Sequence, residues 1–249
     1  MPKKEWFAEW FDTPYYHILY QNRGEEEARG FIKALLSKLN LPLGASLLDL
    51  ACGKGRHSIT LNSYGFKVLG VDLSSKSIAH AKLHENPNLS FDVQDMREPV
   101  EGRTFDAIFN LFTSFGYFDS HKENELVCRS MAQMLAPGGR LVIDFMNAEK
   151  VVSGLVAFEK KRVNDIEFNI SREYTGTHII KTIAFDDKSE SYRYQEKVQA
   201  IEKEQFMELL SPYFEVDFIF GSFIKIDTRL LLFLFPNISR ADLFAYLIF

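Results

Sequence analysis

The sequence predicts an α/β fold: a seven-stranded, mostly parallel sheet covered by helices, with a small antiparallel β meander inserted near its end. Two observations support this prediction. Over residues 1–147, short apolar runs alternate with segments in which apolar residues recur at helical spacing. Beyond residue 147 the pattern changes to an alternation of apolar and polar residues, and two further apolar runs follow it.

The first part of the chain is expected to alternate between strands and helices. A helix is expected over 24–39, where apolar residues share one face and Asn40 and Pro42 follow as ending signals. Five short apolar runs bounded by turn residues or charge are the expected strands: 46–50, 68–72, 89–93, 105–112 and 140–145. Helical patterning separates several of them, at 56–63, 75–84 and 122–135. Alternating strands and helices pair in parallel through right-handed crossovers, which favours a Rossmann-like sheet.

The second part begins with antiparallel strands. The alternation predicts a three-stranded meander with tight turns at 175–177 and 186–189, and 156–163 is a candidate fourth strand. A helix at 203–213 is then expected to return the chain to the main sheet. Two apolar runs are the expected last strands: 214–221 and 228–235.

Composition and charge restrict the function classes. With 249 residues, of which 46% are hydrophobic and 25% charged, the chain suits one globular domain with an inserted elaboration. A net charge of -5 gives no overall attraction for nucleic acid or anionic lipid, so both are disfavoured as partners. Cys52 and Cys128 lack the spacing of a disulfide framework or a metal site, so no bound metal is expected.

The sequence also predicts where the protein resides. The longest apolar run, 230–235, is too short to cross a bilayer, and the N-terminus lacks the apolar stretch of a secretion signal. Together with the two isolated cysteines, this predicts a cytoplasmic protein. The apolar tail 243–249 is expected to pack on the domain or on a partner.

The strongest functional signal is the segment 47–57, in which an apolar strand is followed by Gly-x-Gly and then a helix. Glycines at such a turn let the backbone approach a ligand closely. The second expected strand ends at Asp72, where a carboxylate can accept hydrogen bonds from both hydroxyls of a ribose. Asp95 and Met96 follow the third strand and suit an adenine amine and its ring face. The third glycine of the dinucleotide fingerprint is missing, which disfavours an NAD-dependent enzyme.

These motifs, together with Leu-Ala-Pro-Gly-Gly at 135–139, resemble the class I S-adenosylmethionine-dependent methyltransferases over residues 45–147. The resemblance implies S-adenosylmethionine as the cofactor and an antiparallel last strand, for which 228–235 is suitable. It further implies the residues around the cofactor: Asp49, Ala51, Gly53 and Gly55 at the methionine part, Asp72 and Leu73 at the ribose and adenine, Asp95 and Met96 at the adenine, and Asn110, Leu111 and Phe112 under the sulfonium.

Each carboxylate also has a purely structural alternative when taken singly. Asp49 could cap the following helix, Asp72 could be a turn residue, and Asp95 could lie in a solvated loop. The order and spacing of the whole set favour the cofactor site over these alternatives.

The N-terminal segment is expected to form a lid over the cofactor. Thr13 is a candidate N-cap with Pro14 at the first helical position. Tyr16, Tyr20 and Arg23 then share one face, so that Tyr16, Tyr20 or Arg23 could bind the carboxylate of the cofactor. The alternative is an aromatic helix that simply packs on the core.

The sequence does not identify the methyl acceptor, but it suggests a small molecule. The β insert and the run 113–117 are similar to those of sugar N-methyltransferases, and the acceptor pocket is expected between the two. Tyr117 and His121 are the candidate catalytic residues, His121 because its ordinary pKa of about 6.5 suits a proton acceptor. Tyr117 could instead be a core residue, and His121 could only cap a helix. Tyr192 and Tyr194 could line the pocket or form a dimer contact.

We therefore expect three regions: 1–147 as lid and cofactor-binding core, 148–200 as the β insert, and 201–249 as the completion of the core sheet. Two alternatives to a small-molecule methyltransferase stay open. One is an RNA methyltransferase that uses a basic cluster of the insert: Lys160, Lys161, Arg162 and Arg172. The other is a non-catalytic, S-adenosylmethionine-binding assembly subunit. A homodimer through the insert or the tail is a further expectation.

Overall fold

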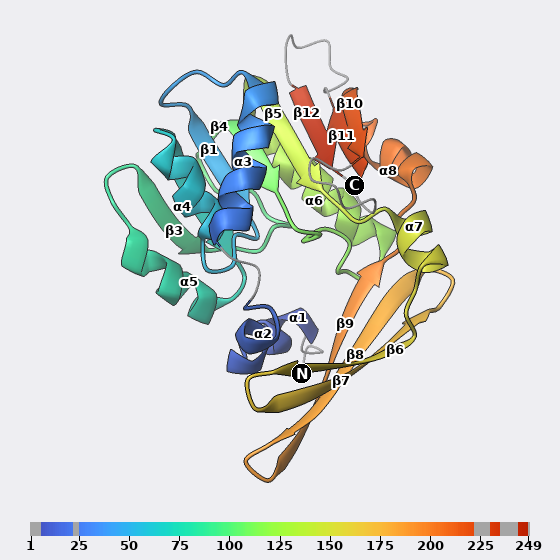
Figure 1. Ribbon diagram of the computed structural model, residues 1–249. Helices are drawn as coiled ribbons and strands as arrows, with labels where there is room; N and C mark the ends of the chain where they lie inside the picture. Colours follow the sequence, from blue (N-terminus) through green and yellow to red (C-terminus); the bar gives the residue numbers. More distant parts are fainter. Residues whose placement is uncertain (1–5, 22–24, 222–229, 235–243, 249) are drawn as a thin grey trace.

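A computed structural model describes residues 6–21, 25–221, 230–234 and 244–248 (Figure 1). Its main sheet has eight strands in the order β10-β11-β12-β5-β4-β1-β2-β3. The strands of the predicted parallel sheet are β1 (Ser46–Leu50), β2 (Lys67–Asp72), β3 (Leu89–Val93), β4 (Phe105–Asn110) and β5 (Leu135–Asp144). These five pair in parallel in the order β3-β2-β1-β4-β5, which confirms the Rossmann-like arrangement.

The sheet ends differently from the prediction. Strands β10 (Val216–Gly221), β11 (Leu230–Leu234) and β12 (Phe244–Ile248) extend it beyond β5. Strand β11 runs antiparallel to both β10 and β12, as expected for 228–235. The count of seven strands is wrong, because the apolar tail forms an additional strand, β12, which pairs in parallel with β5. Pairing with β5 gives the backbone of this tail hydrogen-bond partners that a loosely packed tail would lack.

Helices cover both faces of the sheet. Helices α3 (Glu25–Leu39), α4 (Arg56–Ser63) and α5 (Ser75–Ala81) pack on one face, where Ile32, Leu61 and Ile78 join a buried cluster with Leu47 and Phe109. The other face is covered by α6 (His121–Met134) and α8 (Lys203–Leu210). A 3-10 turn, η1 (Lys82–His84), continues α5, and the short α7 (Ala148–Ser153) leads to the insert. No helix within the described residues is long and apolar enough to cross a membrane.

The insert is a separate four-stranded antiparallel sheet of β6 (Phe158–Val163), β7 (Ile166–Tyr174), β8 (His178–Asp187) and β9 (Glu190–Gln199). The candidate fourth strand is therefore present as β6. The β8–β9 turn contains Lys188 and Ser189, both with positive φ, which is the geometry of a tight two-residue hairpin.

Two short N-terminal helices connect the insert to the main sheet (Figure 1). Helix α2 (Pro14–Leu19) has the predicted cap, since the backbone N–H of Tyr16 donates to Oγ1 of Thr13. The sequence analysis did not predict α1 (Trp6–Trp10). Trp10 and Leu19 pack on the insert, while Phe7 packs on the main core. These helices therefore lie where they can close a cavity between the two sheets.

Candidate active site

A cavity of about 570 Å³ lies at the carboxyl ends of the parallel strands, beneath the N-terminal helices. Its walls come from the loops after β1, β2, β3 and β4, from α1 and α2, and from β9 of the insert. Eleven of the residues predicted for the site line it: Tyr16, Tyr20, Ala51, Gly53, Asp72, Leu73, Asp95, Met96, Leu111, Phe112 and Tyr117. The structure therefore brings most of the predicted site together at one edge of the sheet.

The glycine turn after β1 forms one wall of this cavity. Gly53 has a φ of 57°, and a Cβ added to it would meet no atom within 4 Å, so its bare side faces open space. The backbone N–H of Cys52 donates to the carbonyl of Val71 at 2.9 Å, which ties the turn to β2. Ala51 also has a positive φ, of 63°. The turn therefore offers backbone surface to a ligand without side chains in the way.

Gly55 has a different role from the predicted one. It does not line the cavity, and it caps α4 with a φ of 83°. A Cβ at this position would lie 2.6 Å from the ring of Phe91. Close packing and the left-handed backbone, rather than ligand approach, explain this glycine.

Asp49 lies beneath the glycine turn and does not line the cavity. Its side chain is 1% exposed, and Ser58 donates a hydrogen bond to it at 2.5 Å. Burial raises the pKa of Asp49 to about 6; the hydrogen bond from Ser58 opposes this shift and the charge of Asp72 adds to it. In this structure Asp49 holds β1 to α4 instead of facing the cavity.

Asp72 ends β2 and faces the cavity. Its Oδ2 accepts the backbone N–H of Gly53 at 2.9 Å, and its Oδ1 accepts that of Ser74 at 2.8 Å. Burial raises the pKa of Asp72, and the two backbone hydrogen bonds oppose this effect. The hydroxyl of Ser74 in turn donates to Asp12, which lies between α1 and α2. The carboxylate therefore connects the glycine turn to the second strand and, through Ser74, to the N-terminal helices.

Asp95, after β3, is held by an arginine that the sequence analysis did not select. Arg97 donates through Nε to Oδ1 at 3.0 Å and through Nη2 to Oδ2 at 2.5 Å. Burial alone would raise the pKa of Asp95, but the hydrogen bonds and charge of Arg97 lower it below its ordinary value. The same guanidinium donates to Glu123 at 2.9 Å and lies over the ring of Phe118. The position of Arg97, two residues after the predicted adenine carboxylate Asp95, is the sequence signal that could have identified it.

The segment after β4 has an unusual backbone. Phe112 and Thr113 both have positive φ, of 67° and 58°. Their N–H groups donate to Oδ2 and to the carbonyl of Asp144, at 2.9 and 2.8 Å. Such strain is typical of positions that neighbouring contacts hold in place, often at functional sites. Arg56 lies over the ring of Phe112, 4.1 Å from its centroid.

Asn110 does not line the cavity. It is fully buried, and its Nδ2 donates to the carbonyl of Leu50 at 3.1 Å. Its Oδ1 accepts no hydrogen bond from any described residue. Asn110 therefore joins β4 to β1 beneath the cavity, and Leu111 and Phe112 provide the exposed part of this wall.

The N-terminal helices close the cavity with aromatic side chains. Trp6, Phe11, Tyr16 and Tyr20 line it, and Arg23 lies outside the described residues. The ring centroids of Trp6 and Phe11 lie 5.2 and 5.7 Å from that of Tyr117. Tyr117 therefore lines the cavity and also packs among aromatic residues.

His121 does not reach the cavity, contrary to the expectation. It is the first residue of α6, directly after the N-cap Ser120, and its side chain is 65% exposed. Its Nδ1 lies 3.3 Å from Oε1 of Glu125, one helical turn further along. The helix start directs this side chain to solvent.

Glu196, which was not predicted from the sequence, lines the cavity from the inner face of β9. Its Oε1 accepts hydrogen bonds from Nε1 of Trp10 at 2.8 Å and from the hydroxyl of Tyr20 at 2.7 Å. The predicted wall residues Tyr192 and Tyr194 lie on the same face of β9 but do not line this cavity; Tyr194 stacks on Trp10 with centroids 4.6 Å apart. Alternation alone could not tell which position of β9 faces the cavity.

His17 and Lys54 are further cavity residues that the sequence analysis did not select. The pKa of His17 is lowered to about 4, mainly by burial and then by the charges of Lys54 and His80, while Asp12 opposes the shift. Within the part of the chain that the structure describes, no cluster of three or more His, Cys, Asp or Glu side chains could hold a metal ion.

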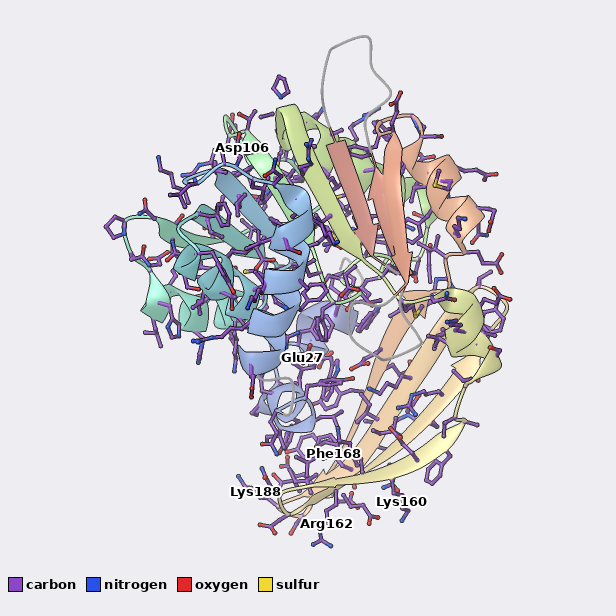
Figure 2. The ribbon with its side chains drawn as sticks, turned by 45° about the horizontal axis from the view of Figure 1, so that its top comes forward. Glu27, Asp106, Lys160, Arg162, Phe168 and Lys188 are labelled. Atoms are coloured by element: carbon purple, nitrogen blue, oxygen red, sulfur yellow. The ribbon has the colours of Figure 1, made fainter. Side chains whose placement is uncertain are left out.

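Two of the four residues of the basic cluster of the insert are paired with acidic groups. Lys160 lies 2.8 Å from Glu167, and Arg172 lies 2.6 Å from Glu159. Lys161 donates to the carbonyl of Leu19. Figure 2 shows Lys160 and Arg162 at the end of the meander far from the main sheet. Lys160, Lys161 and Arg172 therefore each have a partner within the part of the chain that the structure describes.

Comparison with known proteins adds a family match. Residues 47–139 match the model of a methyltransferase domain. Over 130 residues the chain is 32% identical to dTDP-3-amino-3,4,6-trideoxy-alpha-D-glucopyranose N,N-dimethyltransferase from Streptomyces venezuelae, covering 52% of this chain and 54% of that protein. It is 34% identical to glycine N-methyltransferase from Mus musculus over 123 residues, which cover 43% and 42% of the two chains. The chain therefore matches about half the length of these relatives.

Solved structures resemble the fold over most of its length. An S-adenosylmethionine-dependent methyltransferase from Clostridium acetobutylicum ATCC 824 superimposes with a TM-score of 0.72 at 18% identity, covering 89% of this chain and 95% of that one. An S-adenosylmethionine-bound amino pentose methyltransferase from Micromonospora echinaspora gives a TM-score of 0.66 at 21% identity, with 90% and 97% covered. Residues 47–139 therefore match a methyltransferase domain, and most of the chain shares its fold with these solved methyltransferase structures.

Proposed function

We propose that this protein transfers the methyl group of S-adenosylmethionine to an amino group of a small molecule. The observation that carries the proposal is the position of the glycine turn and Asp72 in the same cavity as the aromatic residues of the N-terminal helices. The glycine turn and Asp72 give this cavity features of a nucleotide site, and the aromatic residues form another part of its wall. Relatives named as N-methyltransferases of amino sugars and of glycine support the amine as acceptor.

The residues present fit the cofactor. The open side of Gly53 allows a ligand to approach the backbone, and the oxygens of Asp72 can accept hydrogen bonds from ribose hydroxyls beyond those from Gly53 and Ser74. Met96 and Leu73 line the same end and offer apolar surface to an adenine ring. The cofactor would supply an electrophilic methyl group bonded to a sulfonium.

The protein's part in the reaction is to bind and orient. The acceptor end lies between the loop that contains Tyr117 and strand β9, and aromatic residues of the N-terminal helices line this part of the cavity. Holding two reactants in one orientation can supply much of the acceleration of a displacement reaction. Tyr117 is the candidate that touches the acceptor, because it lines the cavity at this end.

The alternatives receive less support. RNA binding would need an accessible basic face, whereas Lys160 and Arg172 are paired with acidic side chains. A non-catalytic assembly role has no specific observation in its favour.

Transfer of a labelled methyl group tests the proposal. The protein is incubated with labelled S-adenosylmethionine and, in parallel, with glycine, dTDP-amino sugars, their hydroxyl counterparts and total RNA. Label is expected in at least one amine. Label in RNA alone would favour the RNA alternative, and cofactor binding without any transfer would favour the assembly role.

A further inference from the structure

On the inner face of the insert, apolar side chains lie beside charged ones, and Glu196 is a charged residue of this face that lines the cavity. Strands β8 and β9 pair on this face through Ile179–Val198, Lys181–Glu196, Ile183–Tyr194 and Phe185–Tyr192. Only one of these four pairs is charged, and its side chains are little exposed, 15% for Lys181 and 17% for Glu196. A largely buried ion pair seldom stabilises a protein more than apolar residues of similar size would. Because Glu196 of this pair lines the cavity, the geometry points to a function other than stability.

The Glu196 carboxylate is held by groups from three elements. Nε1 of Trp10 in α1 donates to Oε1 at 2.8 Å. The hydroxyl of Tyr20, at the end of α2, donates to Oε1 at 2.7 Å and is shared with Oε2 at 2.9 Å. Nζ of Lys181 lies 3.3 Å from Oε2 and also donates to the hydroxyl of Tyr20. These three donors fix the orientation of the carboxylate, which can accept about four hydrogen bonds in all.

Glu196 also differs from the other carboxylates of the cavity. Asp72 is bound to backbone N–H groups beside the glycine turn, and Asp95 is held by the guanidinium of Arg97. Both belong to the core, whereas Glu196 enters from the insert. The aromatic residues Tyr16 and Tyr20 line the cavity on the same side, with ring centroids 4.9 Å apart. A carboxylate beside aromatic faces favours a group that carries N–H donors or positive charge.

We propose that Glu196 recognises the amino group of the acceptor, and that Lys181 and Tyr20 are positioning residues that hold its carboxylate. This inference rests on the proposed function. The remaining acceptor capacity of Glu196 receives an N–H of the amine, and the aromatic rings surround the nitrogen. Trp10 and Tyr20 come from the N-terminal helices, so the acceptor contact is complete only when these helices are in place.

Kinetics of one matched pair of variants test the role of Glu196. The probes are glycine and dTDP-3-amino-3,6-dideoxy-α-D-glucopyranose, with S-adenosylmethionine as donor. Glu196→Gln keeps the shape of the side chain and removes its charge, and should raise KM for the accepted amine roughly tenfold, as expected for loss of a charge-assisted hydrogen bond. The cofactor Kd should stay within about twofold, since the binding energy of the cofactor comes from other contacts. The control, Glu167→Gln, removes a carboxylate paired with exposed Lys160 and should change neither value.

The positioning role of Lys181 is tested by measuring KM for the amine and the cofactor Kd in two variants. Lys181→Met should raise KM for the amine with an unchanged cofactor Kd, and Lys181→Arg, which retains a cationic donor, should recover most of the loss. A merely structural role predicts instead a lower melting temperature with KM unchanged. Unchanged amine kinetics in a folded Glu196→Gln protein would overturn the inference while leaving the proposed function intact. A wild-type protein that methylates neither amine would contradict the proposed function, and the inference with it.

Discussion

The backbone N–H of Gly53 donates a hydrogen bond to Oδ2 of Asp72 at 2.9 Å. Two loops that follow different strands are thereby joined into one wall of the cavity. The bond uses one acceptor position of the carboxylate and leaves the open side of Gly53 toward the cavity. A cofactor that contacts both the turn and the carboxylate therefore meets a preformed surface, and several consequences can be measured.

The two glycines of the turn should respond differently to substitution. Gly53→Ala should cost about 1–2 kcal/mol of unfolding free energy, because its φ is positive and its Cβ has free space. Gly55→Ala should cost roughly 2–5 kcal/mol, because overpacking against Phe91 adds to the same strain. Gly176→Ala, with a φ of 91° and no atom near its Cβ, is the matched control for strain alone. Chemical denaturation measures all three.

Affinity for the cofactor should differ between Gly53→Ala and its control Gly176→Ala. Gly53→Ala should lose most of its affinity for S-adenosylmethionine, since the new methyl group occupies the approach of the ligand. Gly176→Ala should bind as the wild type does. Normal binding by Gly53→Ala would show that the turn does not contact the cofactor.

The buried Asp49 should make stability depend on pH. Its folded-state pKa of about 6 lies above the ordinary value of 3.8, so the folded protein holds a proton that the unfolded chain releases between these values. The free energy of unfolding should therefore fall as pH rises from about 4 to about 6, by about 3 kcal/mol from this group. Asp49→Asn should lack this contribution. Denaturation curves of the two proteins across this range give the difference; parallel pH dependences would contradict the raised pKa.

Tyr117 should act through its hydroxyl if it touches the acceptor. Tyr117→Phe keeps the ring that packs against Trp6 and Phe11. We expect a lower kcat for the accepted amine with a cofactor affinity within about twofold, the pattern of an interaction made mainly in the transition state. A wild-type kcat in this variant would assign Tyr117 to packing alone.

The cavity residues at the ends of the parallel strands could be predicted from the sequence, because the order of the strands determines which loops lie side by side. Asp72 and Asp95 follow neighbouring parallel strands, so their proximity to the glycine turn could be predicted from the order of elements alone. The same reasoning could not distinguish a residue that faces the cavity from one beneath it. Asp49 and Gly55 belong to the motif but do not line the cavity. Asp49 accepts a hydrogen bond from Ser58 of α4, and Gly55 packs closely against the ring of Phe91.

The remaining differences have similar physical reasons. Glu196 is one of several residues of β9 whose side chains share one face. Which of them lines the cavity depends on how the insert packs against α1 and α2. The sequence predicted His121 at the site because its ordinary pKa suits a proton acceptor, but the start of α6 directs its side chain to solvent. The strand β12 was not predicted, because a run of apolar residues at 243–249 suits a packed end as well as a strand.

Calorimetric titration of S-adenosylmethionine into the wild-type protein and Asp72→Asn tests the central claim most directly. The wild type should bind one equivalent. Asp72→Asn should bind at least roughly tenfold more weakly, because a charge-assisted acceptor for the ribose is lost. Asp165→Asn, an exposed aspartate in the β6–β7 turn, serves as the control. A wild-type protein that binds NAD but not S-adenosylmethionine, or a folded Asp72→Asn protein with unchanged affinity, would contradict the account.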